Sequence, residues 1–289
     1  MFSPVAVGVD GSPESLAAAE WAAREAVRGG RPLRLLHVRN WHPRQDGTEI
    51  AHAAERRRAR RVLRAAEERV LAACPEARPY DEQVEGPATA ALVKAAGDAE
   101  ALVLGSRGLG RVTGLLVGSV ALGVVAQATR PVVLVRAGTE GEAFGAGRRD
   151  VVLGVDVTEP CDEVIAFAFE AARRRRTRLR ALHAWRAPDP LTLGPGEIGL
   201  VGDPQRAGEW LSFLSAVLQV WRDKYPDVEV LETVAEGKPA RALVKAASGA
   251  ELLVVGHRLT DRPGVPRTGP VTHAVIQYTD CPVAVVPHH

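Results

Sequence analysis

The residues with the clearest potential for chemistry are glycines and a serine placed around one loop. Gly105 and Gly108 are followed, after nine further residues, by the pair Gly118-Ser119. The apolar run 101–104 precedes this segment and the apolar run 120–128 follows it, so the segment joins a predicted strand to a predicted helix. Backbone N–H groups in such a loop, together with a helix start, can hold phosphate groups. The spacing therefore indicates an anion site.

Several other side chains are expected at the same place. Arg107 and Arg111 bring guanidinium groups to the loop, and the Ser119 hydroxyl can donate to a phosphate. Asp10 follows the apolar run 5–9 and can accept hydrogen bonds from ribose hydroxyls. Val38 ends the run 33–38 and can meet a flat base through its backbone. Together these residues predict a nucleotide-sized site.

Each of these residues also has a purely structural explanation. Gly105 and Gly108 could be turn glycines, and Asp10 could cap the helix that Pro13 opens. Ser12 is expected to be a helix cap rather than a nucleophile. His37 and His183 end apolar runs and are expected to be core histidines that bond to the backbone. Trp21, Trp210 and Trp221 lie on predicted helices and are assigned to the core, whereas Trp41 or Trp185 could line a base pocket.

The chain is an internal repeat. Residues 85–106 and 236–257 are identical at 13 of 22 positions with an offset of 151. The segments that end at Asp10 and Asp156 match with an offset of 146, so the second copy carries a net insertion of five residues between these anchors. Two domains are expected, over residues 1–137 and 150–289, with a glycine-rich, charged linker between them.

Strand and helix patterns alternate within each copy. The first, fourth and fifth predicted strands are continuously apolar, which is typical of parallel strands covered on both faces. The expected fold is therefore α/β, with two tandem doubly wound (Rossmann-like or flavodoxin-like) domains, each a five-stranded parallel sheet flanked by helices. The expected elements of the first copy are strands 5–9, 33–38, 80–84, 101–104 and 132–135 and helices 12–28, 49–73, 88–96 and 120–128.

The composition disfavours several classes of protein. The net charge is only +2, and the arginine clusters 56–61 and 173–176 lack interleaved aromatic residues, so no nucleic-acid partner is expected. No apolar run reaches the length of a membrane span. Three widely spaced cysteines and an N-terminus without a signal peptide favour the cytoplasm. No cysteine and histidine spacing predicts a metal site.

The loop spacing and the start Val7-Gly8-Val9-Asp10-Gly11-Ser12 resemble the universal stress protein family, ATP-binding type, over nearly the whole chain. The resemblance implies ATP, with Mg²⁺ accompanying the nucleotide, in the crevice beyond the first and fourth strands. It also implies that the last strands 132–135 and 283–286 join as an intrachain pseudodimer, with a homodimer of whole chains as a further option. The ATP-binding residues it implies are Gly8, Asp10, Val38, Gly105, Arg107, Gly108, Gly110, Arg111, Gly118, Ser119 and Val120.

The second copy departs from the loop pattern. An offset of 151 places Leu259 at the position of Gly108 and Pro270 at the position of Ser119. Leucine adds a side chain where backbone should face phosphate, and proline removes both a hydroxyl and an N–H donor. Weak or absent ATP binding is therefore expected in the second copy, although Arg258, Arg262 and Arg267 could partly substitute.

Three functions remain open on the sequence alone. The first is an ATP-binding regulatory or stress-response protein with slow hydrolysis at most, because no nucleophile, general base or metal cluster is evident. The second is an ATP-using enzyme of related architecture, a pyrophosphatase or nucleotidyl transferase; the acid and proline near Ser12 argue against its phosphate loop. The third is an interaction scaffold without a ligand.

Overall fold

The computed structural model describes residues 3–39, 49–106, 117–138, 149–185, 204–259 and 268–289. The first domain contains β1 Val5–Gly8, α1 Pro13–Arg28, β2 Leu33–Arg39, α2 Glu49–Ala73, β3 Pro79–Glu85, α3 Ala88–Ala95, β4 Ala101–Gly105, α4 Ser119–Val125 and β5 Val132–Val135. The second contains β6 Val151–Gly154, α5 Asp162–Arg175, β7 Leu179–Trp185, α6 Pro204–Lys224, β8 Val230–Glu236, α7 Pro239–Ala246, β9 Leu252–Arg258, α8 Pro270–Tyr278 and β10 Val283–His288. The alternation of strands and helices confirms the predicted fold class.

All ten strands form one sheet in the order β3-β2-β1-β4-β5-β10-β9-β6-β7-β8. Each domain contributes five parallel strands, and β5 pairs with β10 in antiparallel fashion, with Val133 opposite Ala284. Strand order within each domain reverses between its first and fourth strands, which is the switch point of a doubly wound sheet. The two crevices therefore lie at β1/β4 and at β6/β9.

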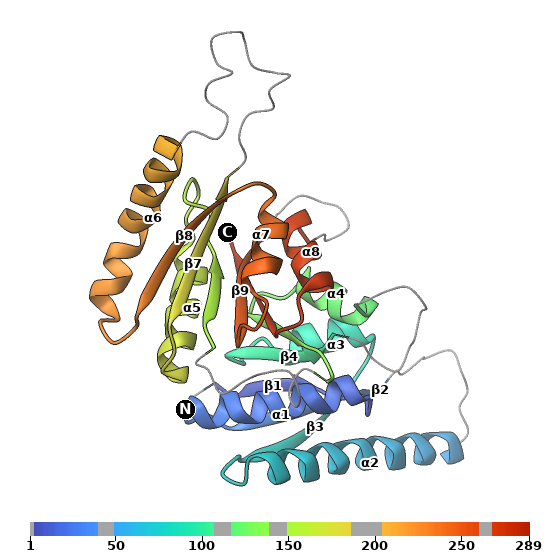
Figure 1. The fold of residues 1–289 in the computed structure, drawn as a ribbon. Helices are drawn as coiled ribbons and strands as arrows, with labels where there is room; N and C mark the ends of the chain where they lie inside the picture. The colour runs from blue at the N-terminus through green and yellow to red at the C-terminus, as the bar shows by residue number, and fades with distance from the viewer. Residues whose placement is uncertain (1–2, 40–48, 107–116, 139–148, 186–203, 260–267) are drawn as a thin grey trace.

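Helices cover both faces of this sheet (Figure 1). One apolar cluster joins α1, α2, α5 and α6 to the sheet, and a second joins α3, α4, α7 and α8 to the opposite face. Successive residues of β1 show the division, since Val5 and Val7 pack into the first cluster while Ala6 packs into the second. Side chains that alternate between two apolar layers account for the continuously apolar strands in the sequence.

Ion pairs connect the domains beside the β5–β10 junction. Arg28 Nη2 lies 2.9 Å from Glu251 Oε1, and Arg174 Nη1 lies 2.8 Å from Glu100 Oε1. The repeat offsets relate Arg28 to Arg174 and Glu100 to Glu251, so the two contacts are copies of one contact. This duplicated pairing fits the approximate twofold relation that an antiparallel strand pair creates.

Candidate functional site

The crevice of the first domain lies where β1 and β4 end together. These strands are parallel neighbours, and their last registered pair is Gly8 with Leu104. A Cβ atom at Gly8 would lie 2.6 Å from Leu104 Cδ2 and 3.2 Å from Leu92 Cδ2. The glycine therefore serves close packing under the crevice, a role that sequence reasoning did not assign to it. The residues that follow each strand, Asp10 and Ser106, start the walls of the crevice.

Asp10 organises the turn between β1 and α1. Its Oδ1 accepts hydrogen bonds from the Ser12 N–H at 2.9 Å and from the Ser12 hydroxyl at 2.6 Å. The Ser12 Oγ in turn accepts from the Ser15 N–H at 3.1 Å, which makes Ser12 the N-cap of α1 and confirms that prediction. Gly11 takes a φ of +86° in this turn, a conformation that favours glycine. The structural role expected of Asp10 is thus present, through Ser12 rather than by direct capping.

The backbone of Val38 faces the crevice. The Leu36 carbonyl accepts from the Val9 N–H on the β1 side, and the Arg39 carbonyl accepts from the Gly86 N–H on the β3 side. Backbone groups alternate in direction along a strand, so Val38, two residues after Leu36, points to the β1 side. Because β1 pairs only as far as Gly8, the Val38 peptide groups lie past its end. This geometry suits a backbone contact to a base.

The far wall is the start of α4. The Gly118 N–H donates to the Ser106 carbonyl at 2.8 Å, and the Leu122 N–H donates to the Gly118 carbonyl. Gly118 therefore holds the loop end in place and does not offer its N–H to a ligand. The first-turn N–H groups that lack intrahelical acceptors belong to Ser119, Val120 and Ala121. Ser119 and Val120 are exposed, so their amides and the Ser119 hydroxyl are accessible.

The structure thus brings seven predicted residues to the neighbouring carboxyl ends of β1, β2 and β4 and to the start of α4: Gly8, Asp10, Val38, Gly105, Gly118, Ser119 and Val120. Five residues that the sequence singled out lie outside the described residues: Trp41, Arg107, Gly108, Gly110 and Arg111. In the second domain Trp185 is buried, and it is its neighbour Ala184 that lines the crevice there.

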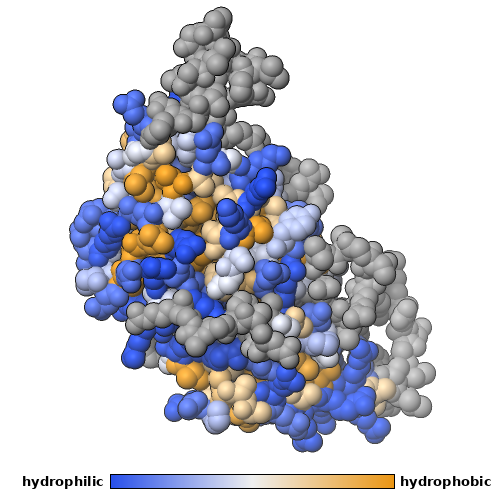
Figure 2. Space-filling view, viewed as in Figure 1, coloured by the Kyte–Doolittle hydropathy of each residue, from blue (hydrophilic) through white to orange (hydrophobic). Residues whose placement is uncertain are grey.

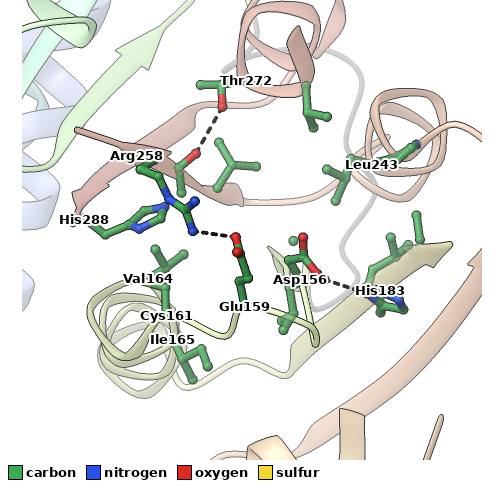
Figure 3. A pocket seen from close by; sticks show the side chains of 18 residues that line it. Asp156, Glu159, Cys161, Val164, Ile165, His183, Leu243, Arg258, Thr272 and His288 are labelled. Atoms are coloured by element: carbon green, nitrogen blue, oxygen red, sulfur yellow. Dashed lines mark hydrogen bonds and ion pairs between the residues drawn. The ribbon is translucent and has the colours of Figure 1, made fainter. Parts of the chain in front are cut away.

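The matching crevice of the second domain contains a cavity of about 420 Å³ (Figure 3). The apolar part of the cavity wall includes Val155, Ile165, Leu182 and Leu243. The polar groups at its edge are Asp156, Glu159, His183, Arg258, Thr272 and His288. This volume falls within the range of small-molecule sites. The sequence predicted a weakened site here, and the structure shows that a cavity nevertheless remains.

The edge where phosphates would enter is altered in this second cavity. Arg258 Nη2 forms an ion pair with Glu159 Oε2, which Figure 3 shows between the end of β9 and the turn before α5. The strand β9 continues to Arg258, paired with His288 of β10, whereas β4 ends at Gly105. Pro270 is the first residue of α8 and supplies no N–H. At this edge the second domain therefore has a carboxylate and a longer strand than the first domain. It also lacks the backbone N–H that Ser119 has at the start of α4.

Both strand-end histidines bond to the backbone as predicted. His37 Nδ1 lies 2.7 Å from the Val9 carbonyl, and His183 Nδ1 lies 3.0 Å from the Val155 carbonyl. These contacts tie the second strand of each domain to the end of the first. Trp210 of α6 covers His183, with 4.9 Å between ring centroids. Among the residues that the structure describes, no acid and hydroxyl are arranged with either histidine as a catalytic triad would require.

Sequence reasoning missed three residues of the second crevice: Glu159, Thr272 and His288. The Thr272 hydroxyl donates to the Gly256 carbonyl at 3.0 Å and so ties α8 to the end of β9. Glu159 lies in the turn between β6 and α5, at the position where the first domain already begins α1 with Pro13, and an acid in a strand-to-helix turn is a signal that could have been noticed. His288 reaches the cavity only because β10 runs beyond its counterpart, which no local pattern showed.

Cys161 also lines the second cavity, at the N-cap of α5. Burial and a hydrogen bond to Glu163 raise the pKa of its thiol. The thiol is therefore protonated at neutral pH, and this position does not provide a nucleophile. Within the described ranges no three His, Cys, Asp or Glu side chains converge as a metal ion would require. Among those same residues, no helix combines the length and apolar character needed to span a bilayer.

Comparison with known proteins places these features in a family. The model of the universal stress protein family matches residues 1–136 and 147–287. A universal stress protein of Mycolicibacterium smegmatis is 32% identical over 295 residues, covering 98% of this chain and 96% of that protein. A universal stress protein of Mycobacterium tuberculosis strain H37Rv is 32% identical over 291 residues, covering 97% and 95%.

A solved structure agrees on the fold: a universal stress protein from Archaeoglobus fulgidus aligns over 100% of both chains with a TM-score of 0.74 at 18% identity. A universal stress protein solved in complex with cAMP is similar to 47% of this chain over 99% of its own, at 28% identity and a TM-score of 0.40. The two family matches span both halves of the repeat, and the relatives match it from end to end. The chain belongs to the universal stress protein family as a tandem of two such domains.

Proposed function

We propose that this protein is a cytoplasmic ATP-binding regulator of the stress response, with one ATP site in the first domain, residues 1–137. The observation that carries the proposal is the convergence of three groups on the β1/β4 crevice. The Val38 peptide faces it from β2, Asp10 borders it after β1, and the exposed first turn of α4 closes it. These groups match base, ribose and phosphate in order along one nucleotide.

The proposed site also includes Gly105 at the end of β4. We assign Arg107, Gly108, Gly110 and Arg111 to it from the sequence, since they lie outside the described residues, and Mg²⁺ would arrive with the nucleotide. ATP is held rather than rapidly consumed, because none of the described side chains at this crevice forms a base and nucleophile pair. A turnover assay checks this part of the proposal. Rapid release of ADP or AMP would favour the enzyme alternative.

The second domain, residues 150–289, is proposed not to bind ATP. Its cavity is large enough for a small molecule, but the Glu159 carboxylate stands at the edge where phosphates would enter, and a negative charge repels them. Arg258 is already paired with that carboxylate, so its positive charge is largely neutralised and attracts a phosphate less than an unpaired arginine would. Pro270 removes an N–H that the first domain supplies from Ser119.

A matched pair of substitutions tests the assignment. Val120 and Val271 are equivalent at an offset of 151; Val120 is 37% exposed at the start of α4, and Val271 lines the second cavity at the start of α8. Tryptophan at either position fills one crevice without opening the core. In calorimetric titration we expect one ATP per chain, at least about tenfold weaker binding for Val120→Trp, equivalent to about 1.4 kcal/mol, and unchanged binding for Val271→Trp. Unchanged binding in Val120→Trp would refute the site.

The sheet also suggests an assembly. The β5–β10 pair supports the proposal that the chain is its own pseudodimer, since each domain's last strand is covered by the other. Two exposed strand edges are thereby removed, which lowers the risk of edge-to-edge aggregation. A chain cut within residues 139–148 and expressed as two domains should reassociate as one heterodimer in analytical ultracentrifugation. Two domains that stay apart would contradict the pseudodimer.

A further inference from the structure

Helix α6 exposes several apolar side chains, and at two of these positions its counterpart α2 exposes arginines. On α6, Phe213 is 57% exposed and Val220 is 71% exposed. An offset of 151 places Arg69 of α2 at the position of Val220 and Arg60 at the position of Leu211. Both helices bury the opposite side, as Leu214 of α6 and Leu63 of α2 show. The difference is therefore confined to the solvent side of α6.

The exposed residues of α6 form one stripe. Five exposed residues follow one another along α6 at spacings of 4, 3, 4 and 4: Glu209, Phe213, Ala216, Val220 and Lys224. This spacing keeps them on one side of a helix and resembles the seam along which two helices pack. At 1.5 Å per residue the stripe is about 22 Å long. We call these five residues the α6 stripe.

The charges at the ends of the α6 stripe are opposite. Glu209 stands near the beginning of α6, and Lys224 is its last residue. None of the described residues forms an ion pair with either of them. The Lys224 ammonium rests 4.9 Å from the Trp221 ring and 5.5 Å from the Tyr225 ring, beside the last turn of the stripe. The stripe therefore presents an apolar centre between one anionic and one cationic end.

We propose that the α6 stripe binds the α6 stripe of a second copy of this chain in an antiparallel, symmetric dimer. With the twofold axis between Ala216 and Val217, Glu209 lies opposite the partner subunit's Lys224. In the same register Phe213 lies opposite the partner subunit's Val220. The two ends and the two large apolar residues of the stripe then each meet a complementary stripe residue, and the small Ala216 lies beside the axis, as an isologous interface allows. A parallel arrangement would instead set Glu209 against Glu209.

The position of α6 in the molecule agrees with this assembly. Figure 1 shows α6 at the outer side of the sheet beside β8, away from α3, α4 and β4 of the first domain. Figure 2 shows apolar residues among charged ones on that side of the molecule. The last strands β5 and β10 already pair with each other and are not available to a second chain. A face of this size lies at the low end of specific interfaces, so a weak, concentration-dependent dimer is expected.

Sedimentation of the full chain over a range of concentrations tests the proposal. The wild-type protein should show a monomer–dimer equilibrium. Val220→Arg, which introduces the α2 residue at that position, should weaken the dimer at least about tenfold, equivalent to about 1.4 kcal/mol. Leu211→Arg is the matched control, because Leu211 is 40% exposed on the other flank of α6 and also receives the α2 residue. It should leave the equilibrium unchanged.

Charge reversal distinguishes the antiparallel register from unspecific apolar contact. Glu209→Lys and Lys224→Glu should each weaken the dimer, because each sets like charges opposite one another across the interface. The double variant should restore it. A wild-type chain that stays monomeric at every concentration would overturn the proposal. So would a dimer that survives Val220→Arg, or single charge variants that the double variant does not rescue.

Discussion

Arg175 joins the two domains through a buried guanidinium group, and replacing it with methionine tests that connection. The side chain is 1% exposed at the end of α5. It forms an ion pair with Glu25 of α1, and its Nε lies 3.3 Å from Glu251 Oε1. The guanidinium carbon also lies 5.6 Å from the centre of the Trp21 ring. Methionine keeps the apolar stem against Trp21 and removes only the charge and its hydrogen bonds.

The expected loss of stability follows from the two carboxylates that Arg175→Met leaves without their buried partner. The Glu25 side chain is 13% exposed, and the cation that remains to it among the described residues is Arg28, whose Nη1 lies 3.9 Å away. Glu251 is 26% exposed and keeps a closer contact to Arg28 at 2.9 Å. Removing one member of a buried ion pair costs about 3–5 kcal/mol, and the remaining contacts favour the lower end, about 3 kcal/mol. The loss should appear as a lower free energy of unfolding.

Urea unfolding followed by tryptophan fluorescence measures this loss. Arg173→Met is the control, because Arg173 lies on the same helix, is 53% exposed and pairs with Glu170 at the surface. Surface pairs of this kind contribute little, so the control should unfold at nearly the wild-type urea concentration. Equal midpoints for Arg175→Met and Arg173→Met would refute the claim that a buried charge holds the domains together.

Further predictions concern the cap and two buried titrating groups. Ser12→Ala should lower the free energy of unfolding by about 1–2 kcal/mol in urea, because it removes the α1 cap, whereas Thr158→Ala should change it less because Thr158 does not cap α5. Burial raises the pKa of the Cys281 thiol to about 12. Between about pH 9 and 12 the thiol therefore loses its proton in the unfolded chain but keeps it in the folded chain, so the free energy of unfolding should fall over this range. The fall should be smaller in Cys281→Ala. Burial lowers the pKa of His257, so stability should fall as the pH drops below about 6.5, and a flatter pH profile in His257→Asn would confirm it. Identical pH profiles of wild type and variant would contradict either assignment.

Much of the fold could be predicted because its signals are local. The Ser12 cap, Pro13 and the glycines at residues 29 and 30 mark both ends of α1, which runs from Pro13 to Arg28 as expected. The helix at 49–73 likewise agrees with its apolar spacing. The helix expected at 120–128 is α4, Ser119–Val125, and so begins one residue earlier and ends three residues earlier. Its last turn is decided by packing against neighbouring elements, which local spacing does not encode.

The candidate site was only partly predictable, because its details depend on contacts between distant segments. The sequence placed Asp10, Val38 and Gly118 near one crevice through strand order alone. It did not show that the Gly118 N–H would bond to Ser106, or that Asp10 would support the α1 cap through Ser12. Each of these hydrogen bonds competes with a contact to ligand, and only a folded turn shows which one forms.

The sequence by itself determined the repeat, the α/β class and the difference between the two loops, because these rest on residue type and spacing within short segments. The tertiary structure decided that the second crevice keeps a cavity and that Glu159 and Arg258 form an ion pair at it. It also decided that arginines and glutamates far apart in the sequence pair between the domains, as Glu25 and Arg175 do across 150 residues. An ion pair depends on where two side chains meet in space, and that position exists only after both domains have folded onto one sheet.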